Sequence, residues 1–188
     1  GAVRKIIKEG EKGALKGIHG TLSQLITVPA DYAVAIETAL GAAIQNIITD
    51  DENSAKRAIN YLKDNRAGRA TFLPLTTLRA SLYDTSDIRE KGFYGRASDL
   101  CKCEDKYRVA IEFLLGKTLI CEDIEAASAL AKREKYGVRI VTLDGQIIHA
   151  GGSFTGGQAL NLTGVLSRSG DLTQLKETIK EKETFRNN

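Results

Sequence analysis

Four glycines within seven residues form the segment that is most suggestive of chemistry. The segment reads Gly151, Gly152, Ser153, Phe154, Thr155, Gly156 and Gly157, and it follows a strand-like run that ends at His149. Backbone N–H groups left bare by glycine can bind a phosphate at the start of a helix. A small nucleotide-binding enzyme that uses this segment as a phosphate loop is one hypothesis, although the spacing matches neither a dinucleotide fingerprint nor a Walker loop.

Two other interpretations of the glycine segment need no small ligand. Glycines remove side chains where another backbone must approach closely, as where strands meet across a subunit boundary. Phe154 would then be an apolar anchor in that contact. A flexible surface loop is the third interpretation, and the sequence leaves all three open.

Two further motifs fail on their spacing. Residues 115–118 end like a Walker loop, but Ile111 stands where the first glycine would have to be. Cys101 and Cys103 could begin a zinc site, yet no second pair of ligands stands at the right spacing. No Ser/His/Asp set and no pair of carboxylates can be assembled without arbitrary choices. We therefore expect no catalytic residue, no metal site and no cofactor in this chain.

Basic residues are the remaining candidates for binding. The net charge is only +3, which by itself does not indicate a nucleic-acid-binding protein but permits a local basic patch. The candidates for contact with DNA are Lys5, Lys8, Lys12, Lys16, Lys63, Arg66 and Arg69. If they share one surface, they predict binding that is independent of DNA sequence and sensitive to salt. Solvated helix faces are the alternative interpretation.

Composition limits the class of protein. The chain has 188 residues, of which 42% are apolar and 27% charged, as expected of a globular chain. It has no long apolar run and no secretory signal, so we expect a cytoplasmic protein with no membrane partner. Three cysteines are an odd number, which favours reduced thiols over a disulfide framework. Because methionine is absent and the chain begins at Gly1, we expect a fragment of a longer protein.

An internal duplication organises the chain. The ten residues that begin at Tyr32 recur at Tyr107, 75 residues later, with seven of ten positions identical. Residues 46–51 likewise parallel residues 118–123, and a strand-like run follows each helical pattern at residues 69–73 and 139–143. The repeated unit is therefore predicted to be helix, strand, helix, strand, in an α+β fold with two similar subdomains.

Local patterns refine this unit. Apolar positions at helical spacing predict buried stripes in two of the helices. These stripes are Ala55, Ala58, Ile59 and Leu62 in the first unit and Ile124, Ala127 and Ala131 in the second. Gly41 and Gly116 are predicted to end helices in the left-handed conformation, and Asp51 is a predicted N-cap. Residues 81–103 are predicted to be an irregular boundary between the subdomains.

The two ends of the chain are strongly charged and carry few apolar residues. Leu172, Leu175 and Ile179 recur at steps of three and four, which is the pattern of a narrow coiled-coil seam. Val3 and Ile6 could face that seam, although the glycines nearby weaken a helix. We expect exposed, short, antiparallel coiled-coil ends that flank the globular part, with frayed terminal helices as the alternative.

Four stretches in this order resemble the hinge domain of bacterial structural-maintenance-of-chromosomes (SMC) proteins. They are residues 17–22, 39–41, 68–75 and 151–157, and the likeness covers roughly residues 17–165. The resemblance implies a homodimerisation domain, with Gly151, Gly152, Gly156 and Gly157 at the contact between two copies. It further implies DNA binding, chromosome condensation and partitioning at the nucleoid, and an ATPase head elsewhere in the parent protein.

The resemblance also implies limits for each part of the chain. They are residues 1–16 for a coiled-coil arm stub, 17–92 for subdomain I, 93–165 for subdomain II with the dimerisation segment, and 166–188 for the returning arm stub. Sheets are expected to extend across the contact between two hinges.

Overall fold

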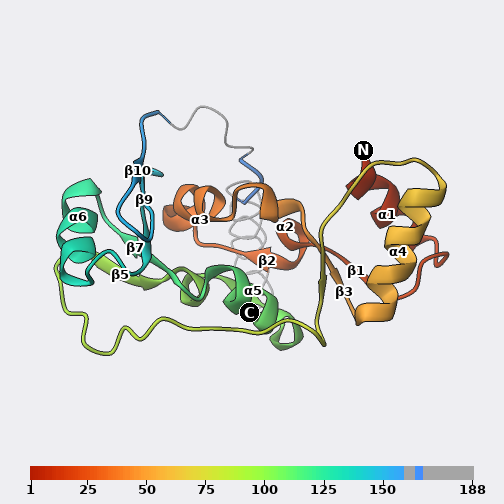
Figure 1. Cartoon of the computed structure of the whole chain (residues 1–188), viewed down its shortest axis with the longest axis horizontal. Helices are drawn as coiled ribbons and strands as arrows, with labels where there is room; N and C mark the ends of the chain where they lie inside the picture. Colours follow the sequence, from red (N-terminus) through yellow and green to blue (C-terminus); the bar gives the residue numbers. More distant parts are fainter. Residues whose placement is uncertain (159–163, 167–188) are drawn as a thin grey trace, which may run out of the picture.

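The computed structural model describes residues 1–158 and 164–166. The molecule is elongated, with one β-sheet toward each end and a layer of helices between them (Figure 1). The fold is mixed helix and strand. In the described part of the chain, no helix is long and apolar enough to cross a bilayer.

The first sheet has three strands in the order β1-β3-β4. Its strands are β1 (Ile18–Thr21), β3 (Ile47–Thr49) and β4 (Phe72–Pro74). β1 runs antiparallel to β3 with a bulge between Ile18 and Gly20, and β3 runs parallel to β4. A parallel pair needs a crossover, and the helix α4 (Glu52–Asp64) provides it. All three strands of this sheet therefore come from the first repeat.

The second sheet reproduces that arrangement and extends it. Its strands are β5 (Phe93–Arg96), β7 (Thr118–Cys121), β8 (Arg139–Thr142), β9 (Ile147–Ile148) and β10 (Phe154–Thr155). β5 is antiparallel to β7, again with a bulge, and β7 is parallel to β8 through the crossover helix α6 (Ile124–Arg133). β9 and β10 add a hairpin, which gives the order β10-β9-β8-β7-β5. Thus β10 and β5 lie at opposite edges.

The layer between the sheets comes equally from both repeats. The first repeat contributes α2 (Leu22–Leu25), β2 (Ile26–Thr27), η1 (Ala30–Tyr32), α3 (Ala33–Leu40) and η2 (Gly41–Gln45), and the second contributes η3 (Ala97–Leu100), β6 (Lys102–Cys103), η4 (Asp105–Tyr107) and α5 (Arg108–Leu115). β2 pairs antiparallel with β6, and Ile26 lies opposite Cys103. α3 contacts α5, and the equivalent residues Ile36 and Ile111 are both fully buried in one core cluster.

The predicted unit of helix, strand, helix, strand is present in both repeats, but it is incomplete. Each repeat also begins with a bulged antiparallel strand, and residues 81–103, predicted to be irregular, contain β5, η3 and β6. A glycine at each bulge breaks the alternation of apolar residues by which short strands are recognised. The predicted division at residues 92 and 93 stays a prediction, although β5 begins at Phe93.

The helix ends agree with the sequence in part. Asp51 caps α4 by accepting a 2.8 Å hydrogen bond from the Ser54 N–H, and Asp123 caps α6 in the same way. Gly41 ends α3 with the positive φ that was predicted, 52°, but its ψ of −131° lies outside the left-handed helical region, and the 3-10 helix η2 follows in place of a strand. Gly116 has a φ of −67°, so its predicted left-handed conformation is wrong. Glycine is favoured at position 116 for a steric reason instead, because a Cβ there would lie 2.1 Å from the Ser81 carbonyl oxygen.

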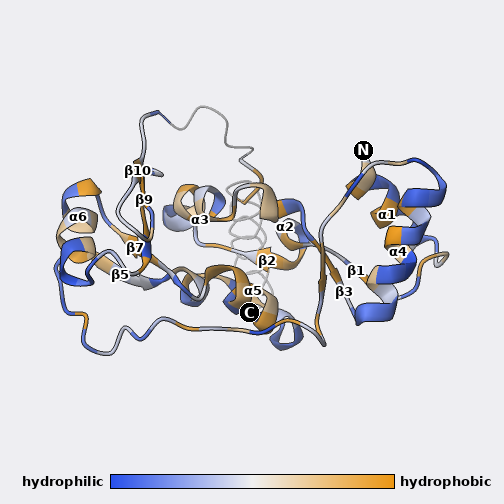
Figure 2. Cartoon of the chain, in the orientation of Figure 1, coloured by the Kyte–Doolittle hydropathy of each residue, from blue (hydrophilic) through white to orange (hydrophobic). Residues whose placement is uncertain are grey.

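Two predicted stripe residues point outward instead. Ile59 is 50% exposed and Ile124 is 36% exposed, whereas the alanines and leucine of the same stripes are buried. Figure 2 shows that hydrophilic residues cover most of the outer side of α4, so Ile59 is an exposed apolar residue on a polar face. The buried stripes on these two helices are therefore narrower than the sequence pattern predicted.

The N-terminal helix α1 (Ala2–Glu11) packs one face into a core cluster, and its assignment to a coiled-coil arm stub stays a prediction. Ile6 is fully buried with Ile47 of β3 and Leu62 of α4. The prediction of an exposed end is therefore wrong for α1, since one turn of sparse apolar residues suffices to anchor it. The predicted returning arm, residues 166–188, lies outside the described residues except for Leu166, which is buried in the central core cluster.

A connector, residues 79–92, joins the two sheets along one side of the molecule (Figure 1). The N–H of Tyr83 donates a 2.9 Å hydrogen bond to the Gly116 carbonyl, and Ile88 is buried beside the sheet residue Leu119. Among the described connector residues, Ile88 is the only one that enters a core cluster as a buried residue. Ile88 is therefore the buried apolar anchor of the connector, and the partly buried Tyr83 packs against the same cluster.

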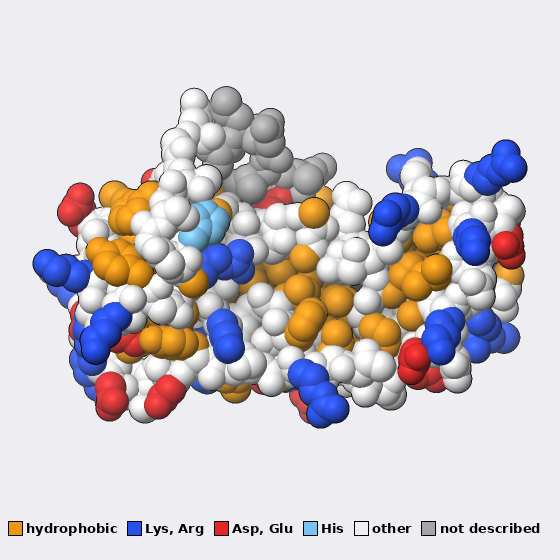
Figure 3. Space-filling view, viewed as in Figure 1, with side chains coloured by type: hydrophobic (Ala, Val, Ile, Leu, Met, Phe, Trp, Pro, Cys, Tyr) orange, Lys and Arg blue, Asp and Glu red, His pale blue; other side chains and the backbone are white. Residues whose placement is uncertain are grey.

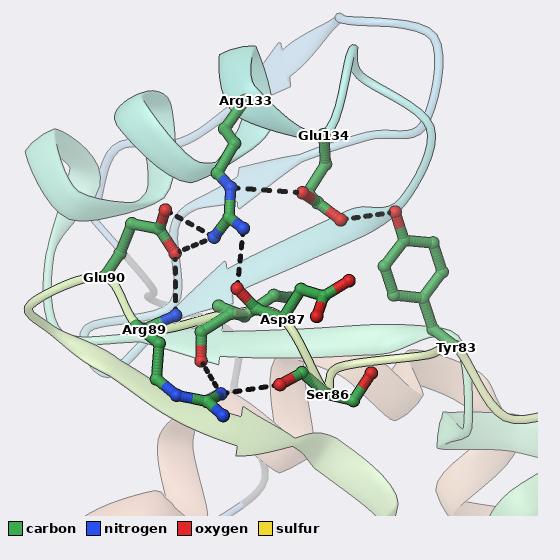
Figure 4. Close-up of polar contacts among 8 residues, drawn as sticks. Tyr83, Ser86, Asp87, Arg89, Glu90, Arg133 and Glu134 are labelled. Atoms are coloured by element: carbon green, nitrogen blue, oxygen red, sulfur yellow. Dashed lines mark hydrogen bonds and ion pairs between the residues drawn. The ribbon is translucent and has the colours of Figure 1, made fainter.

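Polar contacts with the end of α6 hold the connector on both sides of Ile88 (Figure 4). The Arg133 guanidinium donates to the Glu90 carboxylate at 2.5 Å and to the Asp87 carbonyl at 2.6 Å. The Tyr83 hydroxyl donates to the Glu134 carboxylate at 2.8 Å. Desolvation is the largest single influence on the pKa of Glu90 and raises it, but the hydrogen bond from Arg133, the charge of Arg133 and hydrogen bonds from backbone N–H groups together lower the pKa below its usual value. The connector is therefore an ordered segment that packs against the second sheet and the end of α6.

This packing predicts the effect of truncating Ile88. Ile88→Ala is expected to lower the free energy of unfolding by about 2 to 3 kcal/mol, because it removes buried carbon atoms at the one fully packed apolar anchor of the described connector. Leu82→Ala is the matched control, since Leu82 is 44% exposed on the same connector. It is expected to change stability by less than about 0.5 kcal/mol. Urea denaturation measures the free energy of unfolding of both variants. Equal losses of stability would contradict the packing of the connector through Ile88.

Candidate functional site

The glycine segment forms the turn and outer strand of a β-hairpin. The His149 N–H donates to the Ser153 carbonyl at 2.8 Å, and the Gly152 N–H donates to the His149 carbonyl at 3.0 Å. The Gly151 N–H donates to the carbonyl of Tyr136, which ties the turn to the end of α6. No helix begins within residues 149–158. The phosphate-loop hypothesis therefore gains no support, because that site requires the N-terminus of a helix.

Three of the glycines have a conformational reason to be glycine. Gly151, Gly152 and Gly157 have φ values of 96°, 104° and 124°, which L side chains rarely adopt. A Cβ on Gly156 would lie 2.1 Å from the Gln146 side-chain oxygen. That side chain also brackets Gly157, with hydrogen bonds of 2.7 and 2.9 Å to its N–H and carbonyl. Contacts within one chain thus already favour glycine here.

The hairpin presents an apolar side chain and an open strand edge. Phe154 is 54% exposed, and the neighbouring Ser153 and Thr155 are exposed too. Within the described residues β10 pairs only with β9, so its outer N–H and C=O groups have no strand partner. An unpaired edge of this kind is a template for another strand. The predicted interface residues are therefore gathered at one sheet edge.

The Walker-like residues 115–118 and the cysteines have structural roles. Residues 115–118 are the junction between α5 and β7. Burial raises the pKa of Cys101 to about 12, so its thiol stays protonated at neutral pH. Cys121 is similar, with its pKa also raised to about 12 by burial. Among residues 1–158 and 164–166, no group of three or more histidine, cysteine or acidic side chains is placed to hold a metal ion.

The predicted DNA-contacting residues lie on the lobe of α1 and α4 and on the loops beside it. All seven are exposed, and Lys12 forms a 3.9 Å ion pair with Glu9. They are Lys5, Lys8, Lys12, Lys16, Lys63, Arg66 and Arg69. Figure 3 shows basic side chains around this lobe, with few acidic ones on the face in view. The structure places them on one end of the molecule.

A hollow of about 930 Å³ separates this lobe from the central layer. Only Lys8 and Arg69 of the predicted residues line it, together with Arg4, which was not predicted from the sequence. Arg4 stands one helical turn before Lys8, and this spacing was the signal that could have identified it. Polar groups of α2 and its N-cap, Thr21, Ser23 and Gln24, line the opposite wall. The hollow combines three cationic side chains and one carboxylate, that of Glu11, with neutral hydrogen-bonding groups.

One family model matches the chain. It is described as the SMC proteins flexible hinge domain, and it matches residues 15–131. This stretch begins just before β1 and ends within α6, so it covers the first sheet, the central layer and the start of the second sheet.

Several relatives share the sequence. The chromosome partition protein Smc of Desulfitobacterium hafniense is 44% identical over 182 residues, which cover 95% of this chain and 15% of the relative. The protein of the same name from Bacillus subtilis is 42% identical over 186 residues, covering 96% of this chain and 16% of the relative. The chain therefore spans about 15% of the length of the relatives it matches.

Solved structures share the fold. An SMC hinge domain of Geobacillus stearothermophilus, described as an asymmetric dimer, superposes with a TM-score of 0.89 at 42% identity and covers 99% of this chain and 76% of that one. The hinge domain of the Pyrococcus furiosus SMC protein superposes with a TM-score of 0.70 at 35% identity, covering 84% of this chain and 79% of that one. The matched sequence model and these shared topologies agree, and the chain belongs to the family of SMC flexible hinge domains.

Proposed function

We propose that this chain is the hinge through which a longer chromosome partition protein forms homodimers at the nucleoid, and that it has no catalytic activity of its own. The relatives named chromosome partition protein Smc and the hinge described as a dimer support this proposal. On this chain one observation carries it, namely the unpaired outer edge of β10 with Phe154 54% exposed beside it. The ATPase activity belongs to a head domain outside this sequence.

In this dimer β10 of one chain adds to β4 at the edge of its partner's first sheet. β4 is an edge strand that pairs only with β3 among the described residues. The other edge strand of that sheet, β1, is covered by α1, since a Cβ on Gly10 would lie only 2.8 Å from the Cβ of Ile18. Strand addition supplies main-chain hydrogen bonds, and side chains such as Phe154 supply specificity.

The position of the two edges favours a closed dimer. The first sheet and the β10 hairpin lie toward opposite ends of the elongated molecule (Figure 1). A two-fold axis would therefore repeat the β10 to β4 contact at both ends and leave no further edge for growth. The interface we propose on the hairpin consists of Gly151, Gly152, Ser153, Phe154, Thr155, Gly156 and Gly157.

We also propose that the basic end of the molecule binds DNA without sequence preference. Arg4, Lys8 and Arg69 line the hollow, and Thr21, Ser23 and Gln24 offer hydrogen bonds to phosphate or sugar groups opposite. Glu11 also lines the hollow and limits its positive charge. The contact is therefore expected to be weak at physiological salt, where counterion release contributes less.

The dimer predicts a specific effect of Phe154→Asp. A charge at the centre of the contact would have to be buried unpaired, so the dimer dissociation constant is expected to rise at least about 30-fold, as for a hot-spot residue. Phe113→Asp on α5 is the matched control, because Phe113 is similarly exposed at 46% but belongs neither to the hairpin nor to the first sheet and its helix α4. Sedimentation equilibrium measures both. A dimer unaffected by Phe154→Asp would refute the interface.

Phe154 is a sharper test than the glycines. Replacing Gly151, Gly152, Gly156 and Gly157 together is also expected to yield monomers, but three of these positions have positive φ and the fourth contacts Gln146. Disruption of the hairpin would then be confounded with disruption of the interface. Phe154→Asp leaves the backbone free to keep its conformation.

The DNA proposal predicts a change in salt dependence. Lys8→Glu/Arg69→Glu is expected to weaken binding to a duplex and to reduce the slope of log K against log salt by about 0.9 for each phosphate that the variant no longer neutralises. Lys102→Glu/Lys117→Glu changes the net charge equally at exposed sites outside the hollow and is the control. Fluorescence anisotropy over a salt series measures the slopes. Equal slopes for the two double variants would contradict a site in the hollow.

A further inference from the structure

The duplication places two equivalent pairs of rings on the two sides of the central layer. His19 contacts Tyr107 with ring centroids 5.3 Å apart and planes at 81°. Tyr94 contacts Tyr32 with centroids 5.9 Å apart and planes at 63°. The repeat equates His19 with Tyr94 and Tyr32 with Tyr107, each 75 residues apart. The two edge-to-face pairs are therefore one arrangement seen twice, and their differences can be compared residue by residue.

The pair of His19 and Tyr107 is closed. Tyr107 is only 5% exposed, and both nitrogens of His19 are bonded, at 2.8 Å to the Tyr107 hydroxyl and at 2.5 Å to the Asp50 carboxylate. Lys106 covers the Tyr107 ring, with its Nζ 5.2 Å from the ring centroid. A cation over the face of a tyrosine ring is attracted by the ring electrons. In this pair the chain supplies its own cation.

The pair of Tyr32 and Tyr94 is open. Tyr94 is 41% exposed, and the position equivalent to Lys106 is Asp31, so the charge beside the pair is reversed. Among residues 1–158 and 164–166, the only cation over an aromatic ring is Lys106. The open pair thus has the rings of the closed pair, but no described side chain covers them with positive charge.

Carboxylates lie beside the open pair: Asp31 precedes Tyr32 in the chain, and the Glu122 N–H donates a 2.8 Å hydrogen bond to the Gly92 carbonyl just before β5. The pKa of Tyr94 is raised, first by desolvation and then by the charge of Glu122, by Tyr32, and by Asp123 and Asp31. Glu122 is the repeat equivalent of Asp50, which binds His19 in the closed pair. Neither Glu122 nor Asp31 forms an ion pair with any described residue. We call Tyr32, Tyr94, Asp31 and Glu122 the tyrosine cradle.

We propose that the tyrosine cradle binds an arginine side chain from a basic segment of a partner protein. A planar guanidinium stacks on a tyrosine ring and presents a fork of N–H donors to a carboxylate. Both kinds of group are present here, and the closed pair shows that this ring arrangement takes a cation over its face. The negative charge of Asp31 and Glu122 excludes DNA as the ligand of this surface.

The cradle remains accessible in the dimer proposed above. Tyr94 lies on β5, at the edge of the second sheet opposite β10. A partner bound at the cradle would therefore not compete with strand addition at β10. The inference does not rest on the dimer, and it can fail or succeed independently of it.

A model peptide tests the cradle. The probe is acetyl-Gly-Arg-Gly-Arg-Gly-amide, titrated into the whole chain with tyrosine rings labelled with ¹³C. The ring resonances of Tyr32 and Tyr94 are expected to shift and saturate. The same peptide with citrulline in place of arginine is expected to cause no saturable shift, because citrulline keeps the shape and loses the charge. Equal binding of the two peptides would overturn the proposal.

Variants separate the cradle from general attraction between charges. Tyr32→Ala removes the ring equivalent to Tyr107 and is expected to weaken binding of the arginine peptide roughly fivefold, whereas Tyr32→Phe keeps the ring and most of the affinity. Glu122→Gln is expected to weaken it about twofold to threefold. Asp64→Asn removes one exposed carboxylate at the far end of α4 and is the control. If Asp64→Asn and Glu122→Gln had the same effect, the cradle would be refuted.

The repeat itself suggests the decisive variant. Asp31→Lys copies Lys106 of the closed pair and places a cation of the chain beside the open rings. It is expected to weaken binding of the arginine peptide by roughly tenfold or more, and more than Asp31→Asn, because it combines repulsion with occupation of the ring face. Thermal unfolding checks that each variant is folded. Equal affinities for Asp31→Lys and Asp31→Asn would contradict the inference.

Discussion

The packing of α3 against α5 is the constraint on which the rest of the structure depends. Ile36 and Ile111 are fully buried in one core cluster that also contains Leu73 of the first sheet and Val141 of the second. Neither helix could bury its apolar face within its own repeat, so the two repeats must share a core. The β2 to β6 pairing then fixes their relative rotation. Since both sheets rest on this layer, it also sets where their open edges lie.

The sequence predicts those features that repeat with long, regular patterns. The duplication, the strands predicted at residues 69–73 and 139–143 and the Asp51 cap are all read from the residues, because identical constraints produce identical residues. The strands β1 and β5 are missed, since each is short and interrupted at a glycine bulge. The reason for Gly116 is missed as well, because it lies in a contact with Ser81, which no local pattern encodes.

The candidate sites, too, could be predicted only in part from the sequence. The glycine segment is recognised from the sequence because four glycines are unusual, yet their φ values and the Gln146 contact are tertiary facts. The basic residues are recognised as a set, but only Lys8 and Arg69 line the hollow, and Arg4 joins them through the path of α1. The tyrosine cradle leaves no sequence pattern, since its residues come from η1, β5 and the turn before α6. The sequence shows which types of residue could bind a ligand, whereas the fold determines which of those residues lie close together.

Comparison of the two repeats separates what serves the fold from what faces outward. Where the repeats keep the same buried residue, as at Ile36 and Ile111, each copy has the same packing to satisfy. Buried positions also differ, as at Ile47 and Leu119, where one apolar side chain replaces another. Two further differences lie at the surface: only the second repeat carries the β9–β10 hairpin, and Asp31 replaces the cation that Lys106 provides. A shared fold requires no such differences, because the first sheet forms without a hairpin and the open ring pair forms without a covering cation. Exposed differences that the shared fold does not require therefore point to contacts beyond the chain, at the β10 edge and at the tyrosine cradle.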